Sequence, residues 1–413
     1  MPKTSYRMSV LATGLLLFLS CAGCGAVERS PVASDELAAR DRRLSEQQLA
    51  LFANTFELLL ERMERDVDAG RKPSLDMLLL SGGGARGAFG AGFLLAWRTQ
   101  VPADHPLAWR EFDVVSGIST GALQSPFAAI GTEESLRRID TLYRSASPDW
   151  VTVSSLAFFS SGPSLADTTG LDAVLRETID LDLAEQVAAL QERDARQVFV
   201  GSVDLDLARP VTWRLGDAAR RALDSGNPER LFEPMRASAS IPAAFSPTIV
   251  DGAMHVDGAL FGNIRTLSDS RLTDRLLERW QERRPDAPMP AIRFWVVINN
   301  PLRAPPQVVP VDWGSIFARS SDVQMRAQTI QPLEYLALSC ELLRARHGLD
   351  VELRWTAIPP SFEWPEVEME FDARLTQPLS DLGQRLGADP DSWKTEQDLG
   401  IVEREGAVLG RDG

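Results

Sequence analysis

Histidine and cysteine are scarce in this chain of 413 residues, which has three of each. Two of the cysteines, Cys21 and Cys24, lie in an N-terminal leader, so Cys340 is alone in the rest of the chain and a disulfide framework is excluded. Leu336, Cys340 and Leu343 share one face of a predicted helix, which indicates a buried thiol. No HxH, HExxH or paired CxxC spacing is present, and we therefore expect no metal site and no cofactor.

Basic residues are in deficit as well. The chain has 43 lysines and arginines against 58 aspartates and glutamates, which gives a formal net charge of -15. This balance argues against nucleic acid as a partner, and an anionic membrane surface would repel it. Contact with a membrane would therefore depend on lipid chains or apolar patches, and the sequence leaves the oligomeric state open.

A long apolar run is also absent. Residues 10–19 are mainly apolar, but this run is too short for a typical transmembrane helix. It follows the basic residues Lys3 and Arg7 and precedes small residues, which is the pattern of a secretory signal peptide. The end of the leader resembles a bacterial lipobox, with Cys24 favoured over Cys21 because smaller residues precede it; ordinary signal cleavage is the alternative. We expect a lipoprotein anchored to a membrane of the bacterial cell envelope, at the outer membrane or the periplasmic face.

The rest of the chain divides into three parts. Residues 25–74 form a tether and an amphipathic helix, residues 75–301 a core, and residues 302–413 further elements that we expect to pack on the same domain. The helix is expected because apolar residues recur at spacings of three and four, namely Leu49, Phe52, Phe56, Leu59, Met63 and Val67. Its polar face carries many acids, so we interpret it as docked on the core rather than on a membrane. From Leu75 onward, strand and helix patterns alternate, which predicts an α/β fold with a mainly parallel central sheet.

The pentapeptide GISTG at residues 117–121 follows a predicted strand and begins a predicted helix. Gly117, Ser119 and Gly121 give the GxSxG pattern of a nucleophile elbow, in which glycines allow a sharp turn and close packing. Ser119 would lie at the helix N-terminus, where the dipole favours developing negative charge. Because GxSxG alone is common, the prediction of a nucleophile at Ser119 depends on this strand–turn–helix context.

An earlier strand-to-helix turn contains GGGARG, whose consecutive glycines let several N–H groups converge on one negative oxygen. The turn lacks the lysine and hydroxyl of a P-loop. It does spell GxGxxG, but the acid about twenty residues further on, Asp104, lies in a proline-flanked loop and not at a strand end, which disfavours dinucleotide binding. Since Ser119 follows on the next such turn, we interpret this loop as an oxyanion hole in which Arg86 organises the backbone; its residues are Gly82, Gly83, Gly84, Ala85, Arg86 and Gly87.

The segment TIVDGAMHVDGAL at residues 248–260 contains two candidate acids. Asp251 begins an Asp-Gly pair between two short strand patterns, which is a strong hairpin signal, so we assign it to a turn. Asp257 follows the returning strand, where a side chain can be directed into a site. We therefore favour Asp257, followed by Gly258 and Ala259, as the catalytic acid.

Each histidine has a non-catalytic interpretation. His105 lies in a predicted loop, and His255 is either a neighbour of Asp257 or a packed side chain. His347 precedes a glycine at the end of a predicted helix, where imidazole suits the C-terminal dipole and glycine suits the cap. The order Ser119, Asp257, His347 also fits the triad of an α/β-hydrolase esterase, and this alternative stays open.

Together, the three motifs in this order resemble the patatin-like phospholipase family. GGGARG matches the family's oxyanion motif GGGx[RK]G, GISTG its GxSxG, and Asp257–Ala259 its DG[AG]. The intervening segments GPSLADTTGLDAVLRETI and ASASIPAAFSP are also similar. Asn263 resembles the asparagine that follows DG[AG] in the family, whereas the proline usual near it is replaced by IRT at residues 264–266. The resemblance covers residues 75–301.

The resemblance implies a three-layer α/β/α fold and a serine acyl-ester hydrolase of phospholipase A or lysophospholipase type. It also implies a Ser119–Asp257 dyad, in which Ser119 attacks the ester and Asp257 takes its proton without histidine. A lipid-anchored enzyme of this kind would act on the acyl lipids of its membrane, and the apolar stretch at residues 150–162 is interpreted as a lid or lipid contact, or else an internal strand. The rivals are a catalytically silent envelope lipoprotein that binds or scaffolds, and a nucleotide-binding protein.

Overall fold

The computed structural model describes residues 29, 31–153, 163–266, 270–304 and 306–399. The expected leader with Cys21 and Cys24, and nine residues of the expected lid, 154–162, lie outside the described residues. The strands are β1 (Ser74–Leu80), β2 (Val114–Gly117), β3 (Thr152–Val153), β4 (Ala166–Asp167), β5 (Gln197–Asp204), β6 (Arg209–Arg214), β7 (Thr248–Val250), β8 (Ala253–Asp257), β9 (Ala291–Ile298) and β10 (Val351–Ala357). The α-helices are α2 (Ser34–Asp68), α3 (Gly87–Gln100), α4 (Thr120–Ile130), α5 (Glu133–Arg144), α6 (Thr169–Thr178), α7 (Leu181–Asp194), α8 (Leu215–Ser225), α9 (Glu229–Ser238), α10 (Ser270–Arg283), α11 (Trp313–His347) and α12 (Ala373–Gly387).

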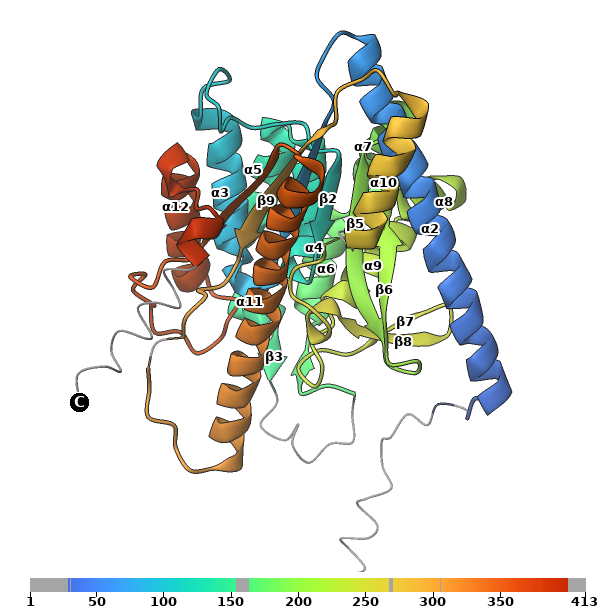
Figure 1. The fold of residues 1–413 in the computed structure, drawn as a ribbon. Helices are drawn as coiled ribbons and strands as arrows, with labels where there is room; N and C mark the ends of the chain where they lie inside the picture. Colours follow the sequence, from blue (N-terminus) through green and yellow to red (C-terminus); the bar gives the residue numbers. More distant parts are fainter. Residues whose placement is uncertain (1–28, 30, 154–162, 267–269, 305, 400–413) are drawn as a thin grey trace, which may run out of the picture.

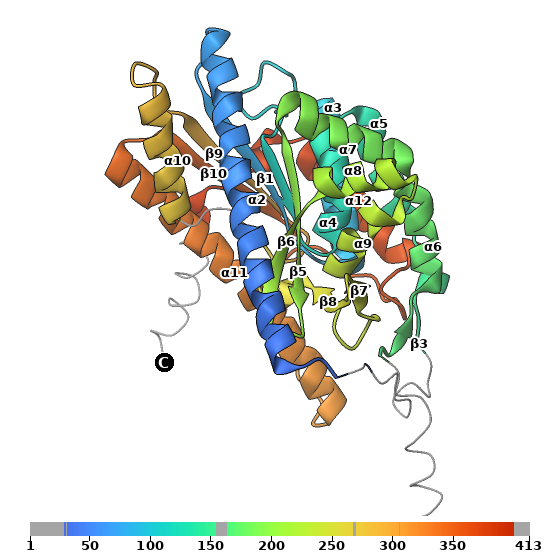
Figure 2. The ribbon, with the colours of Figure 1, turned by 90° about the vertical axis from the view of Figure 1, so that its right-hand side faces the viewer.

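The central sheet has the strand order β10-β9-β1-β2-β5-β8-β7, and β6 pairs with β5 outside this path. The five strands from β10 to β5 are parallel, whereas β6, β7 and β8 run antiparallel to their neighbours. Helices cover both faces of the sheet (Figures 1 and 2). This arrangement is the predicted three-layer α/β/α fold with a mainly parallel sheet.

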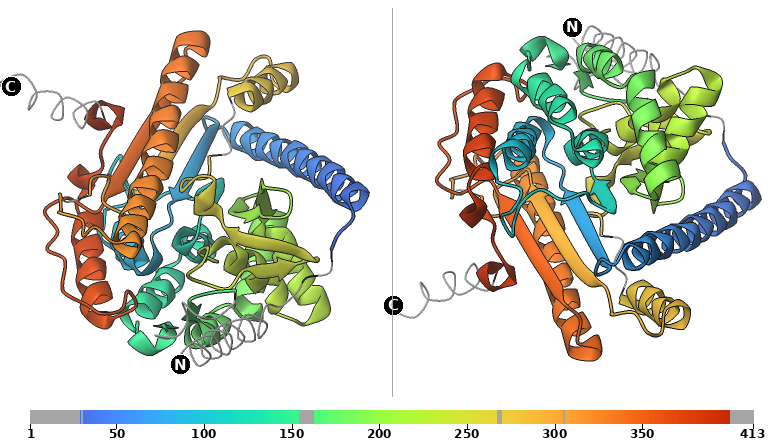
Figure 3. Two further views of the ribbon diagram at one scale, coloured as in Figure 1. Left: turned by 90° about the horizontal axis from the view of Figure 1, so that it is seen from below. Right: turned by 90° about the horizontal axis from the view of Figure 1, so that it is seen from above.

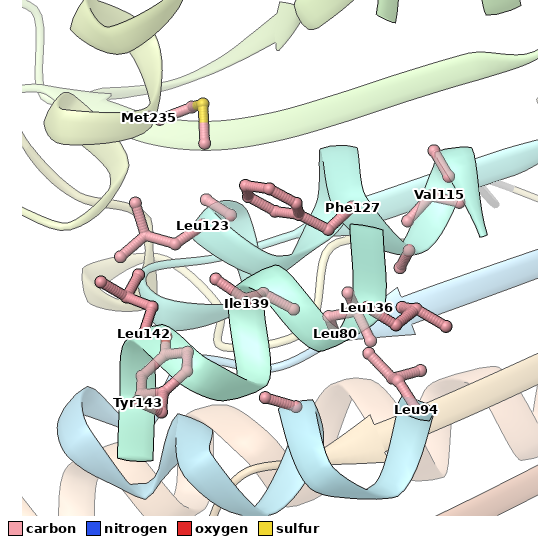
Figure 4. Close-up of a cluster of buried hydrophobic side chains, with 14 of the residues drawn as sticks. Leu80, Leu94, Val115, Leu123, Phe127, Leu136, Ile139, Leu142, Tyr143 and Met235 are labelled. Atoms are coloured by element: carbon pink, nitrogen blue, oxygen red, sulfur yellow. The ribbon is translucent and has the colours of Figure 1, made fainter. Parts of the chain in front are cut away.

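Strand alternation divides the interior into two cores. On β1, Met77 and Leu79 belong to the core under α2, α10 and α11, whereas Leu78 and Leu80 belong to the core under α3, α4 and the remaining helices. Figure 3 shows the helices arranged on the two faces of the sheet. In the second core, side chains of α4 and α5, Phe127 and Ile139 among them, pack with residues of α3 and α9 (Figure 4). The apolar run of β1 at residues 77–80 is therefore explained by burial on both faces.

The long helix α2 docks on the sheet through its C-terminal half, where Leu59, Leu60 and Met63 are buried and Arg62 pairs with Asp113. Leu49 is 70% exposed, so the predicted apolar face was wrong at its N-terminal end. The helix extends there past the sheet and is held by ion pairs to the end of β5 and the turn after it, such as that of Arg40 with Asp204. No described helix has the length and apolar character needed to cross a membrane.

The residues after 301 add to the same sheet and the same cores. Strand β10 pairs in parallel with β9, and α12 packs closely on α3, where Gly383 meets the backbone of Phe89. Cys340 of α11 is fully buried, as predicted, and burial raises the pKa of its thiol to about 12.

The end of β5 brings two distant strands together. Strand β6 pairs along residues 199–204 of β5, so β2 and β8 must both use the opposite edge of β5. Along that edge Gly117 of β2 pairs with Val200, and Asp257 of β8 pairs with Ser202. Two residues of strand span about 7 Å, so the ends of β2 and β8 meet head to head.

Candidate active site

The turn after β2 holds Ser119 in a strained conformation. Its φ of 54° and ψ of -121° are unusual for a residue other than glycine, and α4 begins at the next residue. A Cβ on Gly117 would lie 2.1 Å from the carbonyl oxygen of Gly121, and a Cβ on Gly121 would lie 2.2 Å from that of Leu80. Gly117 is therefore required for the turn to close, and Gly121 for the turn to pack on β1.

Asp257 lies where β8 meets this turn. Its carboxylate accepts a hydrogen bond from the Ala259 amide at 2.8 Å. The residue is only 3% exposed. Burial raises the pKa of Asp257 to about 6, and the neighbouring Ser119 side chain and Ala259 amide only partly oppose this. The structure thus places a serine hydroxyl against a carboxylate of raised basicity.

Asp251 lies in the turn between β7 and β8, as the sequence predicted. Asp251 and Gly252 both have positive φ, at 48° and 77°, which is the signature of a type I′ hairpin turn. Asp251 is exposed there, whereas Asp257 lies at the buried end of the same hairpin.

The glycine loop lies beside the elbow, and its backbone donors divide into two groups. The Gly82 amide donates to Asn263 Oδ1 at 2.9 Å and the Ala85 amide to Glu370 Oε1 at 3.3 Å. Within the described residues, the Gly83 and Gly84 amides donate no hydrogen bond. These two N–H groups are the ones left to bind an anion.

Arg86 bonds to the backbone of its own loop. Its Nε donates to the Gly83 carbonyl oxygen at 3.1 Å, and its own amide donates to the same oxygen at 3.1 Å. Its side chain lines a surface cavity with α11 rather than the cavity that contains Ser119.

Polar residues from distant elements hold both turns, and sequence reasoning missed most of them. Asn299 Nδ2 donates to the Ser81 carbonyl at 2.8 Å, and Asn300 Nδ2 donates to the Gly82 carbonyl at 2.6 Å. Ser238 Oγ accepts the Ser119 amide at 3.0 Å. The Asn-Asn pair after the apolar strand β9 was the available signal, because β9 neighbours β1 and its end lies beside the glycine loop.

A narrow apolar cavity opens on Ser119. Its free volume is about 30 Å³, which is room for about two water molecules. Apart from Arg236, which pairs with Asp172 at 2.7 Å, the lining is mostly aliphatic and aromatic: Leu123, Leu142, Trp150, Leu171, Leu175, Ile241, Phe245 and Phe371. In this conformation the cavity is too small for an acyl chain, so lining segments must separate before one enters.

None of the three histidines joins Ser119. His347 is the last residue of α11 and bonds to Asp274 at 3.0 Å. Because β10 begins four residues later, at Val351, His347 lies at the amino ends of the parallel strands. Ser119 lies at their carboxyl ends. His255 bonds to Ser202 at 3.0 Å and packs on Trp213, and the His105 ring accepts the Leu107 amide at 3.1 Å. This placement does not assemble the Ser119–Asp257–His347 triad.

No group of acids, histidines and cysteines that could hold a metal occurs in the part of the chain that the structure describes.

Residues 78–268 match the model of the patatin-like phospholipase family. The crystal structure of VipD from Legionella pneumophila aligns with 78% of this chain and with 68% of its own chain, at 11% sequence identity. The TM-score of this alignment is 0.34, which is too low to support an argument about fold or function. No curated protein matches the chain. The chain carries a patatin-like phospholipase domain at residues 78–268, and such a domain implies lipid acyl hydrolase activity.

Proposed function

We propose that this protein is a serine acyl-ester hydrolase of phospholipase A or lysophospholipase type that works through Ser119 and Asp257. The observation that carries the proposal is the placement of Ser119, at a strained turn, beside the buried carboxylate of Asp257, with no histidine beside the pair. An aspartate of ordinary pKa is a weak base near neutral pH, but a pKa of about 6 brings Asp257 closer to the working pH.

The proposed reaction proceeds in two halves. Ser119 Oγ attacks the ester carbonyl carbon while its proton passes to Asp257. The resulting oxyanion accepts hydrogen bonds from the N–H groups of Gly83 and Gly84. Collapse breaks the bond to the alcohol, which takes the proton from Asp257 as it leaves. A water molecule then attacks the acyl-enzyme with Asp257 as base, and this releases the fatty acid and restores Ser119.

Two features support a lipid in a membrane as the substrate. The cavity at Ser119 is apolar, as an acyl chain requires. Apolar side chains are also exposed near the start of α11, where Val308 is 98%, Val311 97% and Phe317 63% exposed. Helix α11 begins after β9 has ended, at the same end of the parallel sheet as Ser119 (Figure 1). An anchor at Cys24, or at Cys21, would hold this end at a bacterial envelope membrane, and both cysteines lie outside the described residues.

Single substitutions test the catalytic pair. Ser119→Ala and Asp257→Asn should each lower the hydrolysis of a p-nitrophenyl acyl ester by at least about 10³-fold, whereas His347→Ala should keep full activity. Ser125→Ala is the matched serine control, because its hydroxyl bonds within α4 to the Ala122 carbonyl at 2.9 Å. Loss of activity in His347→Ala would instead establish the triad.

A serine-reactive fluorophosphonate probe separates an enzyme from a silent lipoprotein. It should label the wild type and not Ser119→Ala. Equal labelling of the two, or none at all, would refute Ser119 as the nucleophile. Lipid analysis of cells that carry wild type or Ser119→Ala then identifies the head group and the acyl position.

A further inference from the structure

A second cavity, of about 330 Å³, lies behind the elbow, on the side of the sheet that α11 covers. Residues of β5, of the turn after β8 and of α11 line it. Ile118 and Gly258, the chain neighbours of Ser119 and Asp257, form its wall toward the catalytic pair. The proposed mechanism makes no use of this space.

Arg265 lines this cavity, and no described residue forms an ion pair with it. Its Nε is buried and makes no hydrogen bond with any described residue, and its Nη2 donates to the neutral hydroxyl of Thr212. The residue as a whole is only half-buried, because part of it faces the open cavity. No acid is among the described residues that line the cavity.

Other buried arginines of the protein are compensated. Arg236 bonds to Asp172 at 2.7 Å, and Arg196 donates to two backbone carbonyls, at 2.8 Å and 2.5 Å. Arg354 gives the closest comparison, because its Nε is also buried without a hydrogen bond to a described residue, yet its guanidinium forms an ion pair with Glu352. In Arg265, burial lowers the pKa of the guanidinium, and no acid among the described residues opposes this.

A charge that is partly removed from water and has no partner is unfavourable, and a partner of opposite charge in the cavity would offset part of this cost. The cavity also offers neutral hydrogen-bonding groups in Thr266, Gln328, Gln331 and Tyr335. A guanidinium matches the oxygens of a phosphate with two parallel N–H groups. Arg265 also lies within the IRT segment, where the sequence departs from the family pattern.

We propose that this cavity binds a phosphate group, held by Arg265. The phosphate has two possible sources: a free phosphate ester, or the head group of a phospholipid whose ester lies at Ser119. The second source rests on the proposed function and the first does not. A cavity of about 330 Å³ lies at the lower end of the range for small-ligand sites, which fits either source.

Calorimetric titration of the full-length chain tests the site directly, with inorganic phosphate and glycerol 3-phosphate as separate probes. Arg265→Gln should weaken binding about tenfold or more, because a hydrogen bond to a charged group is lost. Arg354→Gln, the matched control, should bind as the wild type does. Without phosphate, Arg265→Gln should melt at the same temperature as wild type or higher, because it removes an uncompensated charge; a merely structural arginine would lower the melting temperature.

The source is decided by kinetics in mixed micelles with phosphatidylglycerol and with diacylglycerol, which has no phosphate. A head-group site predicts that Arg265→Gln lowers kcat/KM about tenfold for the phospholipid and leaves that for diacylglycerol unchanged. If the site binds free phosphate, Arg265→Gln should leave the ratio of kcat/KM for the two lipids unchanged, whereas it should still weaken phosphate binding in the titration. If Arg265→Gln changes neither the titration nor the ratio, the site is refuted. If neither lipid is hydrolysed, the proposed function fails, and the titration still decides the phosphate site.

Discussion

Replacing Asp257 with asparagine should inactivate the protein and make it more stable. The carboxylate is buried against Ser119 and Ala259, and no cation contributes to its pKa. Asparagine has nearly the same shape and keeps an oxygen that can accept the Ala259 amide, so the change removes a charge and little else. A site that holds a buried charge for chemistry does so at the expense of stability.

The magnitude and its pH dependence follow from the raised pKa. Burial moves the pKa of Asp257 from 3.8 to about 6, and a difference of about two pH units corresponds to about 3 kcal/mol of folding free energy. Below pH 4 the carboxyl is protonated in both the folded and the unfolded chain, so it costs nothing. As the pH rises from 4 to 6, the unfolded chain releases its proton first and the folded state loses stability. Above pH 6 the full cost is present.

Urea unfolding of wild type and Asp257→Asn between pH 4.5 and pH 8 provides the assay. The variant should gain about 3 kcal/mol over wild type at pH 8 and much less at pH 4.5. Asp251→Asn, on the exposed turn of the same hairpin, is the control and should show no such trend. A variant that is less stable than wild type at pH 8, or equally stable at every pH, would refute the reasoning.

Four further predictions concern the same site and its surroundings. The kcat/KM of wild type should rise tenfold per pH unit below about pH 6 and level off above it, as expected for a base with the pKa of Asp257; a flat profile from pH 5 to pH 8 would contradict this. Gly121→Ala should cost about 3 kcal/mol or more in urea unfolding, because its Cβ would lie 2.2 Å from the Leu80 carbonyl, whereas Gly226→Ala, with nothing within 4 Å, should cost only about 1 kcal/mol. Glu370→Ala should raise kcat/KM by up to about tenfold by releasing the Ala85 amide for the oxyanion, and an unchanged rate would show that this amide does not take part. Phe317→Ser should lower hydrolysis of lipid vesicles about tenfold and leave that of a soluble ester unchanged; equal effects on both would exclude a membrane contact.

The local elements were predictable because their signals are local. Apolar runs followed by glycine turns gave β1 and β2, and the first Asp-Gly pair gave the hairpin of β7 and β8. The choice between Asp251 and Asp257 also followed from turn chemistry, because a residue at the tip of a two-residue turn is directed to solvent. Sequence patterns alone therefore suffice to select Ser119 and Asp257 as the candidate catalytic residues.

The partners of the glycine loop were not predictable in this way. Asn299 reaches the loop because β9 lies next to β1, and Glu370 reaches it from the segment before α12. The Asn-Asn pair after β9 marks a polar strand end, but only the sheet order decides that this end lies beside the glycine loop, and no short pattern around Glu370 indicates its contact. The cavity around Arg265 has the same origin, since α11 closes it from a position more than sixty residues further along the chain.

Because β2 and β8 pair with the same edge of β5, the distance between Ser119 and Asp257 does not depend on the length of the chain between them. Residues 120–256 lie between the proposed nucleophile and the proposed base, yet the length of this segment does not enter the distance between Ser119 and Asp257. That distance is set by the two residues of β5 from Val200 to Ser202. The connecting segments are therefore free to change in length, for instance to accommodate other lipids, while one residue inserted at Gly201 would move the base away from its serine.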